Sequence, residues 1–157
     1  MTSSDKRNDP RLRAALDAFL EFRVADIDIW RRAGQMLDLT TNAMMVLAVV
    51  LRSHYRGEAV RQVDIRTALH LSAAGASTII DVLEERGLVK REPFEGDRRA
   101  LRIVPTIEGH AVEEIVAEAD DYLLDLLAEM QPNEVAAVVR VFDAMRVYGA
   151  SQFPVDG

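Results

Sequence analysis

The stretch from 72 to 109 constrains the fold of this chain most strongly, because a helical pattern is followed there by an extended one. The small residues that come after Ser72 suit the N-terminus of a helix, and Ile79 and Leu83 lie at helical spacing on one apolar stripe. Gly87 is typical of the residue that ends a helix. We therefore expect one helix that begins near Ser72 and ends at Gly87.

A hairpin is expected directly after this helix. Leu88 and Val89 begin an extended segment, a polar tip spans 94–99, and residues 100–104 lead back. A helix with a hairpin beside it is a winged helix, in which the helix can lie in the major groove of DNA while the hairpin reaches phosphates or the minor groove. The sequence predicts a mainly α fold with a small β-hairpin.

Three motifs support this prediction: Gly-Leu-Val-Lys-Arg at 87–91, Asp-Arg-Arg at 97–99 and Pro-Thr-Ile-Glu-Gly at 105–109. They resemble the wing of the multiple-antibiotic-resistance (MarR) regulators, although Pro105 replaces the usual Leu. A fainter resemblance covers nearly the whole chain from about Pro10. It implies a winged helix-turn-helix domain with a helical dimerisation layer, and a homodimeric, DNA-binding transcription regulator.

We expect one domain over 10–157 after a polar, disordered tail at 1–9. The winged helix would occupy about 38–105, and the dimerisation helices about 10–34 and 106–149. A long first helix has little to pack on in so small a chain, and pairing with a second subunit is a natural solution.

Capping residues set the expected helix boundaries. Asp9-Pro10 suits the start of the first helix, and Thr40 would cap a second helix whose residues 43–51 are apolar on every face and hence buried. Thr106 would cap one long helix that continues to Met130, and Pro132 would begin the last one.

Two further segments precede the expected recognition helix. Ala59 and Val60 would form a short strand against the wing, and 62–69 a positioning helix with Val63, Ile65 and Leu69 as apolar contacts. This helix departs from the family at Arg61, where Ser or Thr is common, at Arg66 and at His70. Phosphate contacts by Arg61 and Arg66 and a merely solvated face are both open.

The recognition helix would be nearly bare of charge. No Arg or Lys occurs between Arg66 and Arg86, so the strongest reader of guanine is missing, and Thr78 stands where the family often has a basic residue. Small residues let a helix approach DNA closely, and hydroxyls can bond phosphates or bases. We expect weak direct readout with a contribution from DNA shape. The resemblance implies DNA contacts by Ser72, Ala74, Gly75, Ser77 and Thr78.

The wing supplies the expected cationic contacts. Arg98 and Arg99 suit phosphate or minor-groove contact, because a guanidinium stays charged and can fork onto phosphate oxygens. The resemblance assigns the minor-groove contact to Arg99. Asp97 would hold the turn by pairing with Arg91 or with Arg99.

The net charge of −7 is unexpected for a protein that binds nucleic acid. Its distribution eases the conflict, because residues 52–104 contain 10 Arg and Lys against 8 Asp and Glu, and the remainder contains 9 against 18. The basic excess coincides with the winged helix. It is small, so we expect modest affinity.

The resemblance also implies a small-molecule effector bound between the dimerisation layer and the wing domain. Thioethers adapt to varied ligand shapes, but plain core filling is the simpler interpretation of the two adjacent methionines at 44 and 45. Candidate lining residues are Trp30, Met36, Met44, Met45 and His54.

Other chemistry finds little support. The absence of cysteine excludes disulfides and thiolate metal sites, and three isolated histidines (His54, His70 and His110) favour surface or capping roles over a metal site. Acidic pairs at 113–114 and 120–121 suit a solvated helix face. We therefore expect no enzyme, cofactor or metal. Without an apolar signal segment or membrane-length run, a cytoplasmic protein is expected.

Two functions remain open. One is a regulator, expected to be a repressor, that binds a pseudo-palindromic operator as a homodimer and is released by an effector. The other is a winged-helix dimer that binds ligands or proteins without reading a DNA sequence. The bare recognition helix and the net acidity favour the second.

Overall fold

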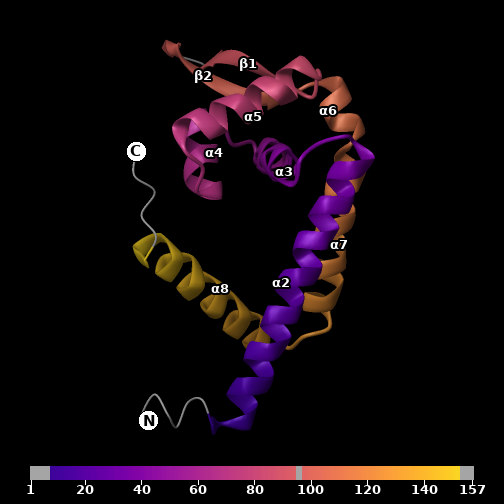
Figure 1. Cartoon of the computed structure of the whole chain (residues 1–157), viewed down its shortest axis with the longest axis vertical. Helices are drawn as coiled ribbons and strands as arrows, with labels where there is room; N and C mark the ends of the chain where they lie inside the picture. Colours follow the sequence, from indigo (N-terminus) through magenta and orange to yellow (C-terminus); the bar gives the residue numbers. More distant parts are fainter. Residues whose placement is uncertain (1–7, 95–96, 153–157) are drawn as a thin grey trace. The chain divides into compact units, whose positions relative to one another are not determined.

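The computed structural model describes residues 8–94 and 97–152, without the side chains of 97–99, 119 and 149–152. It is mainly helical with one two-stranded hairpin, as expected (Figure 1). The chain consists of two compact units, Met1–Met44 and Met45–Gly157. In chain order the elements are α2 (Pro10–Met36), α3 (Thr41–Tyr55), α4 (Gln62–Leu69), α5 (Ala73–Glu85), β1 (Val89–Phe94), β2 (Asp97–Pro105), α6 (Ile107–Ala111), α7 (Glu113–Ala128) and α8 (Pro132–Gln152).

The first unit contains α2 and the start of α3. The side chain of Asp9 caps α2 by accepting a hydrogen bond of 2.9 Å from the Arg11 N–H, as the sequence predicts. Thr40 caps α3 through a bond of 3.2 Å from the Ala43 N–H to its hydroxyl. The disordered tail expected at 1–9 falls almost entirely outside the described residues.

The core of the second unit forms around α3. Val46, Leu47 and Leu51 are fully buried, which confirms that this apolar segment is an internal helix. Ile65 of α4 joins them, but Val63 is 45% exposed. The expectation that Val63 packs inward is wrong, because residues two apart lie on nearly opposite sides of a helix.

The hairpin begins where α5 ends. Gly87 has φ +69°, the left-handed conformation that favours glycine at a helix end, and the Leu88 N–H donates to the Leu83 carbonyl. Strands β1 and β2 are antiparallel. In place of the short strand expected at 59–60 the structure has a single bridge at Val60, in which the Ile103 N–H donates to the Val60 carbonyl at 2.7 Å.

The tip of the hairpin is shorter than the predicted 94–99. Phe94 ends β1, Asp97 begins β2, and these two residues are paired. Because Phe94 and Asp97 are paired, strand pairing continues into the polar segment that the sequence suggested was a turn. The register of the two strands shifts between Pro93 and Phe94.

The single long helix expected from Thr106 to Met130 is wrong, since the chain leaves the helical conformation at Val112. Thr106 caps α6 as predicted, accepting from the Gly109 N–H at 3.0 Å, and its hydroxyl also donates to the Gly87 carbonyl. Gly109 lies so close to β1 that a β-carbon added to it would be 2.0 Å from the Leu88 oxygen. These contacts fix α6 to the base of the wing, and α7 starts anew after it.

The histidines are not all isolated, which corrects the sequence-based expectation. The rings of His54, at the end of α3, and His110, on α6, meet edge to face with their centres 4.9 Å apart. Among the described residues, no group of three or more His, Cys, Asp or Glu side chains is placed to hold a metal ion.

No single helix in the described part of the chain is long and apolar enough to span a membrane. One bent pair, α2 with α3, reaches the necessary length and composition only when the two are combined.

Candidate nucleic-acid interface

The N-terminus of α5 is built from small residues and is open to solvent. Ser72 caps the helix by accepting a bond of 3.0 Å from the Gly75 N–H, which confirms the predicted start. Ala74 and Thr78 are exposed together with Ser72, whereas Gly75 and Ser77 are half-buried. The opposite side of the helix, with Ala76, Ile80 and Leu83, is buried in the core. One face of α5 is therefore available for a partner.

The turn between α4 and α5 fixes the two helices in a helix-turn-helix. His70 ends α4 in the left-handed conformation (φ +52°), a position where glycine is favoured. The side-chain amide of Gln62 then donates to the Ala73 carbonyl at 3.3 Å. This bond joins the first turn of α4 to the first turn of α5.

Arg91 ties the wing to α5. Its guanidinium binds the carboxylates of Glu84 and Asp81, the latter at 2.5 Å, and its backbone N–H donates to Glu84 at 2.9 Å. Burial lowers the pKa of Arg91, but the hydrogen bonds that it donates to Asp81 and Glu84 outweigh this and raise the pKa. The hairpin is therefore held beside α5, as Figure 1 shows.

The other wing residues predicted to act lie at its tip. Arg98 and Arg99 belong to the backbone of β2, and their side chains, like that of Asp97, lie outside the described residues. Lower in the hairpin, Glu92 accepts from Lys90 at 2.8 Å and from Arg102 at 3.1 Å. The hydrogen bond from Lys90 is the main cause that lowers the pKa of Glu92. Lys90 and Arg102 are therefore both paired within the hairpin, with the same carboxylate.

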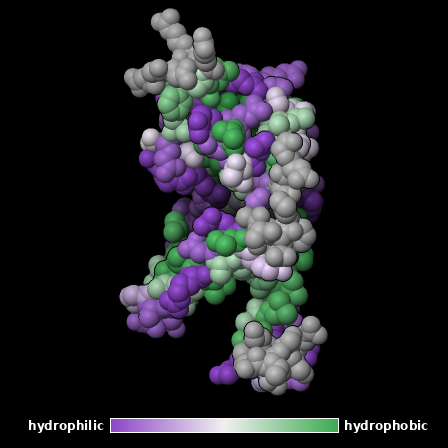
Figure 2. Space-filling view, turned by 90° about the vertical axis from the view of Figure 1, so that its left-hand side faces the viewer, coloured by the Kyte–Doolittle hydropathy of each residue, from purple (hydrophilic) through white to green (hydrophobic). Residues whose placement is uncertain are grey.

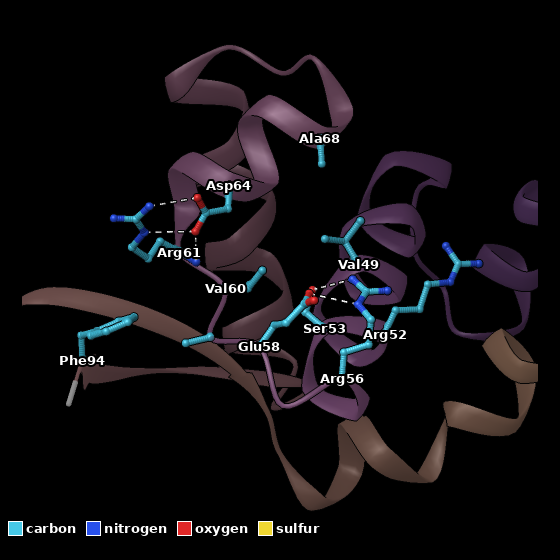
Figure 3. Close-up of a pocket in the computed structure, with 11 residues that line it drawn as sticks. Val49, Arg52, Ser53, Arg56, Glu58, Val60, Arg61, Asp64, Ala68 and Phe94 are labelled. Atoms are coloured by element: carbon cyan, nitrogen blue, oxygen red, sulfur yellow. Dashed lines mark hydrogen bonds and ion pairs between the residues drawn. The ribbon is translucent and has the colours of Figure 1, made fainter. Parts of the chain in front are cut away.

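A cavity of about 720 Å³ lies beside α4 (Figure 3). Its walls come from the end of α3, the segment that follows it, α4 and the Phe94 ring at the end of β1. Two of its cations are paired locally, Arg56 with Glu58 at 3.0 Å and Arg61 with Asp64 at 3.0 Å. Cavities of this size accept small organic ligands.

Arg61 and Arg66, the candidate phosphate contacts of α4, have different surroundings. Arg61 is half exposed, and its guanidinium and backbone N–H both donate to Asp64. The bond from the Arg61 N–H is the half of a capping box that an acidic residue at the third helical position supplies, and the side-chain cap that Ser or Thr would give is absent at Arg61. Arg66 is half-buried in the last turn of α4.

Replacing Asp64 with asparagine should remove a pH-dependent part of the stability. The hydrogen bond from Arg61 lowers the pKa of Asp64, so its contribution is complete above the ordinary pKa of an aspartate and is lost as the pH falls through the lowered one. Both side chains are over a third exposed, so we expect less than about 1 kcal/mol. Urea unfolding at neutral and acidic pH would measure it. Equal losses at both pH values would contradict this account.

The candidate effector residues belong to different units. In the first unit Trp30 is buried, with its indole N–H 3.2 Å from Asp26, Met44 is fully buried and Met36 is 73% exposed. In the second, Met45 is half-buried and His54 lines a cavity of about 210 Å³ beside β2.

Sequence reasoning missed one ion pair that joins the winged helix to α7. The Nε of Arg52, on α3, donates to Asp120 at 2.7 Å, and both residues line a cavity of about 430 Å³. The two residues are 68 positions apart, and the sequence suggested only a solvated helix face for Asp120. No local signal connects them.

Comparisons with known proteins agree with this geometry. Residues 37–100 match the family model described as "MarR family". The fold is similar to a transcription regulator MarR from Oenococcus oeni PSU-1, with a TM-score of 0.67, 17% identity, and coverage of 83% of this chain and 97% of that one. The fold is also similar to AbsC from Streptomyces coelicolor, a MarR family transcriptional regulator. The TM-score is 0.65, the identity is 24%, and the match covers 92% of this chain and 97% of that one.

A third similar structure contains DNA. It is a mutant of MepR from S. aureus bound to an oligodeoxyribonucleotide, with a TM-score of 0.54, 22% identity, and coverage of 82% of this chain and 94% of that one. The comparison with curated proteins found no match.

Proposed function

We propose that this chain is a DNA-binding transcription regulator of the MarR type and that it acts as a repressor. The match of residues 37–100 to the MarR family model supports this proposal. The observation on which the proposal rests is the open N-terminal face of α5, with the wing held beside it by Arg91. A helix that presents small residues can enter the major groove while the hairpin contacts the backbone. Since its ligand is DNA, we place it in the cytoplasm.

A homodimer is part of the proposal. Within the described residues, large apolar side chains are exposed on α7 and α8. Figure 2 shows hydrophobic residues among hydrophilic ones on one face of the protein. Amphipathic helices of this kind can bury their apolar side chains against a second copy of the chain. Two α5 helices would then enter successive major grooves, about 34 Å apart, on a pseudo-palindromic operator. The exposed residues include Tyr122, Leu123, Leu124, Leu126, Val139, Phe142 and Met145.

An effector would act by preferring one arrangement of the DNA-binding helices. A ligand that binds the incompatible arrangement more tightly releases DNA, and a ligand with equal affinity for both changes nothing. The cavities of about 720 and 430 Å³ in the second unit are of suitable size. The candidate residues Trp30, Met36, Met44, Met45 and His54 remain a separate prediction for its location.

The alternative is an interaction module that does not read DNA sequence, and the lack of Arg and Lys on α5 favours it. Enrichment of fragments from the protein's own genome separates the two functions. A regulator retains a small set of duplexes that share a motif, whereas an interaction module retains fragments without a common sequence. The second result would overturn the proposal.

Arg99→Ala should weaken DNA binding and flatten its dependence on salt. Each lost phosphate contact reduces the slope of log K against log salt by about 0.9. Titration of an enriched duplex at four salt concentrations measures the slope. Arg146→Ala, on α8, serves as the control, because this largely exposed cation lies outside the winged helix. An unchanged slope for the Arg99 variant would show that Arg99 does not contact the DNA phosphates.

A further inference from the structure

The exposed face of α5 is lined by methyl groups. Ala74, Thr78 and Val82 follow one another at intervals of four residues, which places them along one side of a helix, and all three are exposed. Val82 is 38% exposed although it is apolar. The core contacts of α5 are made by Ala76, Ile80 and Leu83 on the other side. These three methyl-bearing side chains are therefore not needed for the core.

The hydroxyl of Thr78 is already engaged by its own helix. Its oxygen donates a hydrogen bond of 3.0 Å to the Ala74 carbonyl. Such a bond to the residue four positions earlier uses the only proton that the side chain can donate. What Thr78 offers to a partner is its γ-methyl group and the lone pairs of an acceptor oxygen.

Nitrogen donors are absent from the side chains of α5, whose sequence from 73 to 85 contains no Arg, Lys, His, Asn or Gln. The nearby guanidinium of Arg91 is occupied by Asp81 and Glu84. Guanine presents two acceptors in the major groove, which need donors from the protein. An A·T pair also presents two acceptors and one donor in the major groove, and what it alone adds is the thymine methyl group.

We propose that Ala74, Thr78 and Val82 read thymine methyl groups, so that the operator places A·T pairs under α5. The inference rests on the proposed DNA binding and specifies which bases that site selects. Methyl contacts supply the discrimination, and the Thr78 oxygen can accept from the adenine amino group. A G·C pair has no methyl group to contact, and none of these three side chains has a free donor for the guanine acceptors.

Deoxyuridine tests the proposal, because it differs from thymidine only by the missing C5 methyl group. In a duplex enriched from the genome, each thymidine of a half-site is replaced singly by deoxyuridine, and Kd is measured with the full chain. We expect at least one replacement to weaken binding about fourfold, the worth of one buried methyl-sized group. Thr78→Ser, which retains the hydroxyl, should cost a similar factor on the unmodified duplex.

If the deoxyuridine and Thr78→Ser remove the two sides of one contact, their effects on the free energy of binding should not add. Thr78→Ser on the corresponding deoxyuridine duplex should therefore bind no more weakly than on thymidine. Thr78→Val, which keeps the methyl group and loses the hydroxyl, is the matched control and should retain the sensitivity to deoxyuridine.

The outcomes separate this inference from the function on which it rests. If no motif is enriched, the proposed function fails, and the inference fails with it. If a motif is enriched but every deoxyuridine duplex binds within twofold of the original, DNA recognition stands and methyl reading is overturned. Guanines essential for affinity under α5 would overturn it equally.

Discussion

Gly109→Ala is expected to lower the free energy of unfolding by about 3 kcal/mol or more. The added β-carbon would lie 2.0 Å from the Leu88 backbone oxygen, and neither backbone can yield without moving α6 away from the wing. The Thr106 hydroxyl, which joins Gly87 to the first turn of α6, would be displaced by the same movement. Urea unfolding followed by circular dichroism at a fixed protein concentration would measure the loss.

Gly75→Ala provides a closely matched control. Gly75 is also the third residue of its helix, and its N–H also donates to the capping hydroxyl at 3.0 Å. There the new β-carbon would meet only the Ser72 side-chain oxygen, at 3.0 Å, while alanine gains about 1 kcal/mol over glycine in a helix. We expect a net change within about 1 kcal/mol. Equal losses for the two variants would show that the contact with Leu88 is not what requires glycine.

Arg91→Met should lower the free energy of unfolding by about 2 kcal/mol, because hydrogen bonds to charged groups are worth more than neutral ones. It would leave Asp81 and Glu84 side by side without their common partner. The wing would also lose its link to α5, so DNA affinity should fall even at temperatures where the variant is fully folded. Unfolding and DNA titration of the same preparation measure both effects.

Lys90→Met is the control on the neighbouring residue of β1. Its ammonium group is half exposed and pairs only within the hairpin, with Glu92. Exposed pairs of this type contribute little to stability, so this variant should unfold almost like the original protein. If the two variants lose similar stability and affinity, Arg91 does not have the positioning role assigned to it.

Features that depend on neighbouring residues could be predicted from the sequence. The caps at Asp9, Thr40, Ser72 and Thr106 are all found, because a capping side chain bonds a backbone N–H two or three residues away. The end of α5 at Gly87 is also local, since it needs only a residue that tolerates positive φ.

Features that depend on distant residues could not. The contacts of α6 with Gly87 and Leu88 join residues about twenty positions apart, and the separate helix α6 that they hold was not expected. The partners of Arg91 lie seven and ten positions earlier on α5, and Asp97, which the sequence suggested, lies six positions later, so chain spacing did not distinguish them. The contact between His54 and His110 likewise arises only when α3 and α6 meet. Spacing along the chain contains no information on such pairs.

The central claim is that the winged helix of this chain selects a DNA sequence. The most direct measurement is the ratio of Kd for an enriched duplex to Kd for a scrambled duplex of the same composition, at several salt concentrations. We expect a clear preference for the enriched duplex at every salt concentration, with the scrambled duplex bound only through its phosphates. Equal affinities for the two duplexes at every salt concentration would contradict the claim.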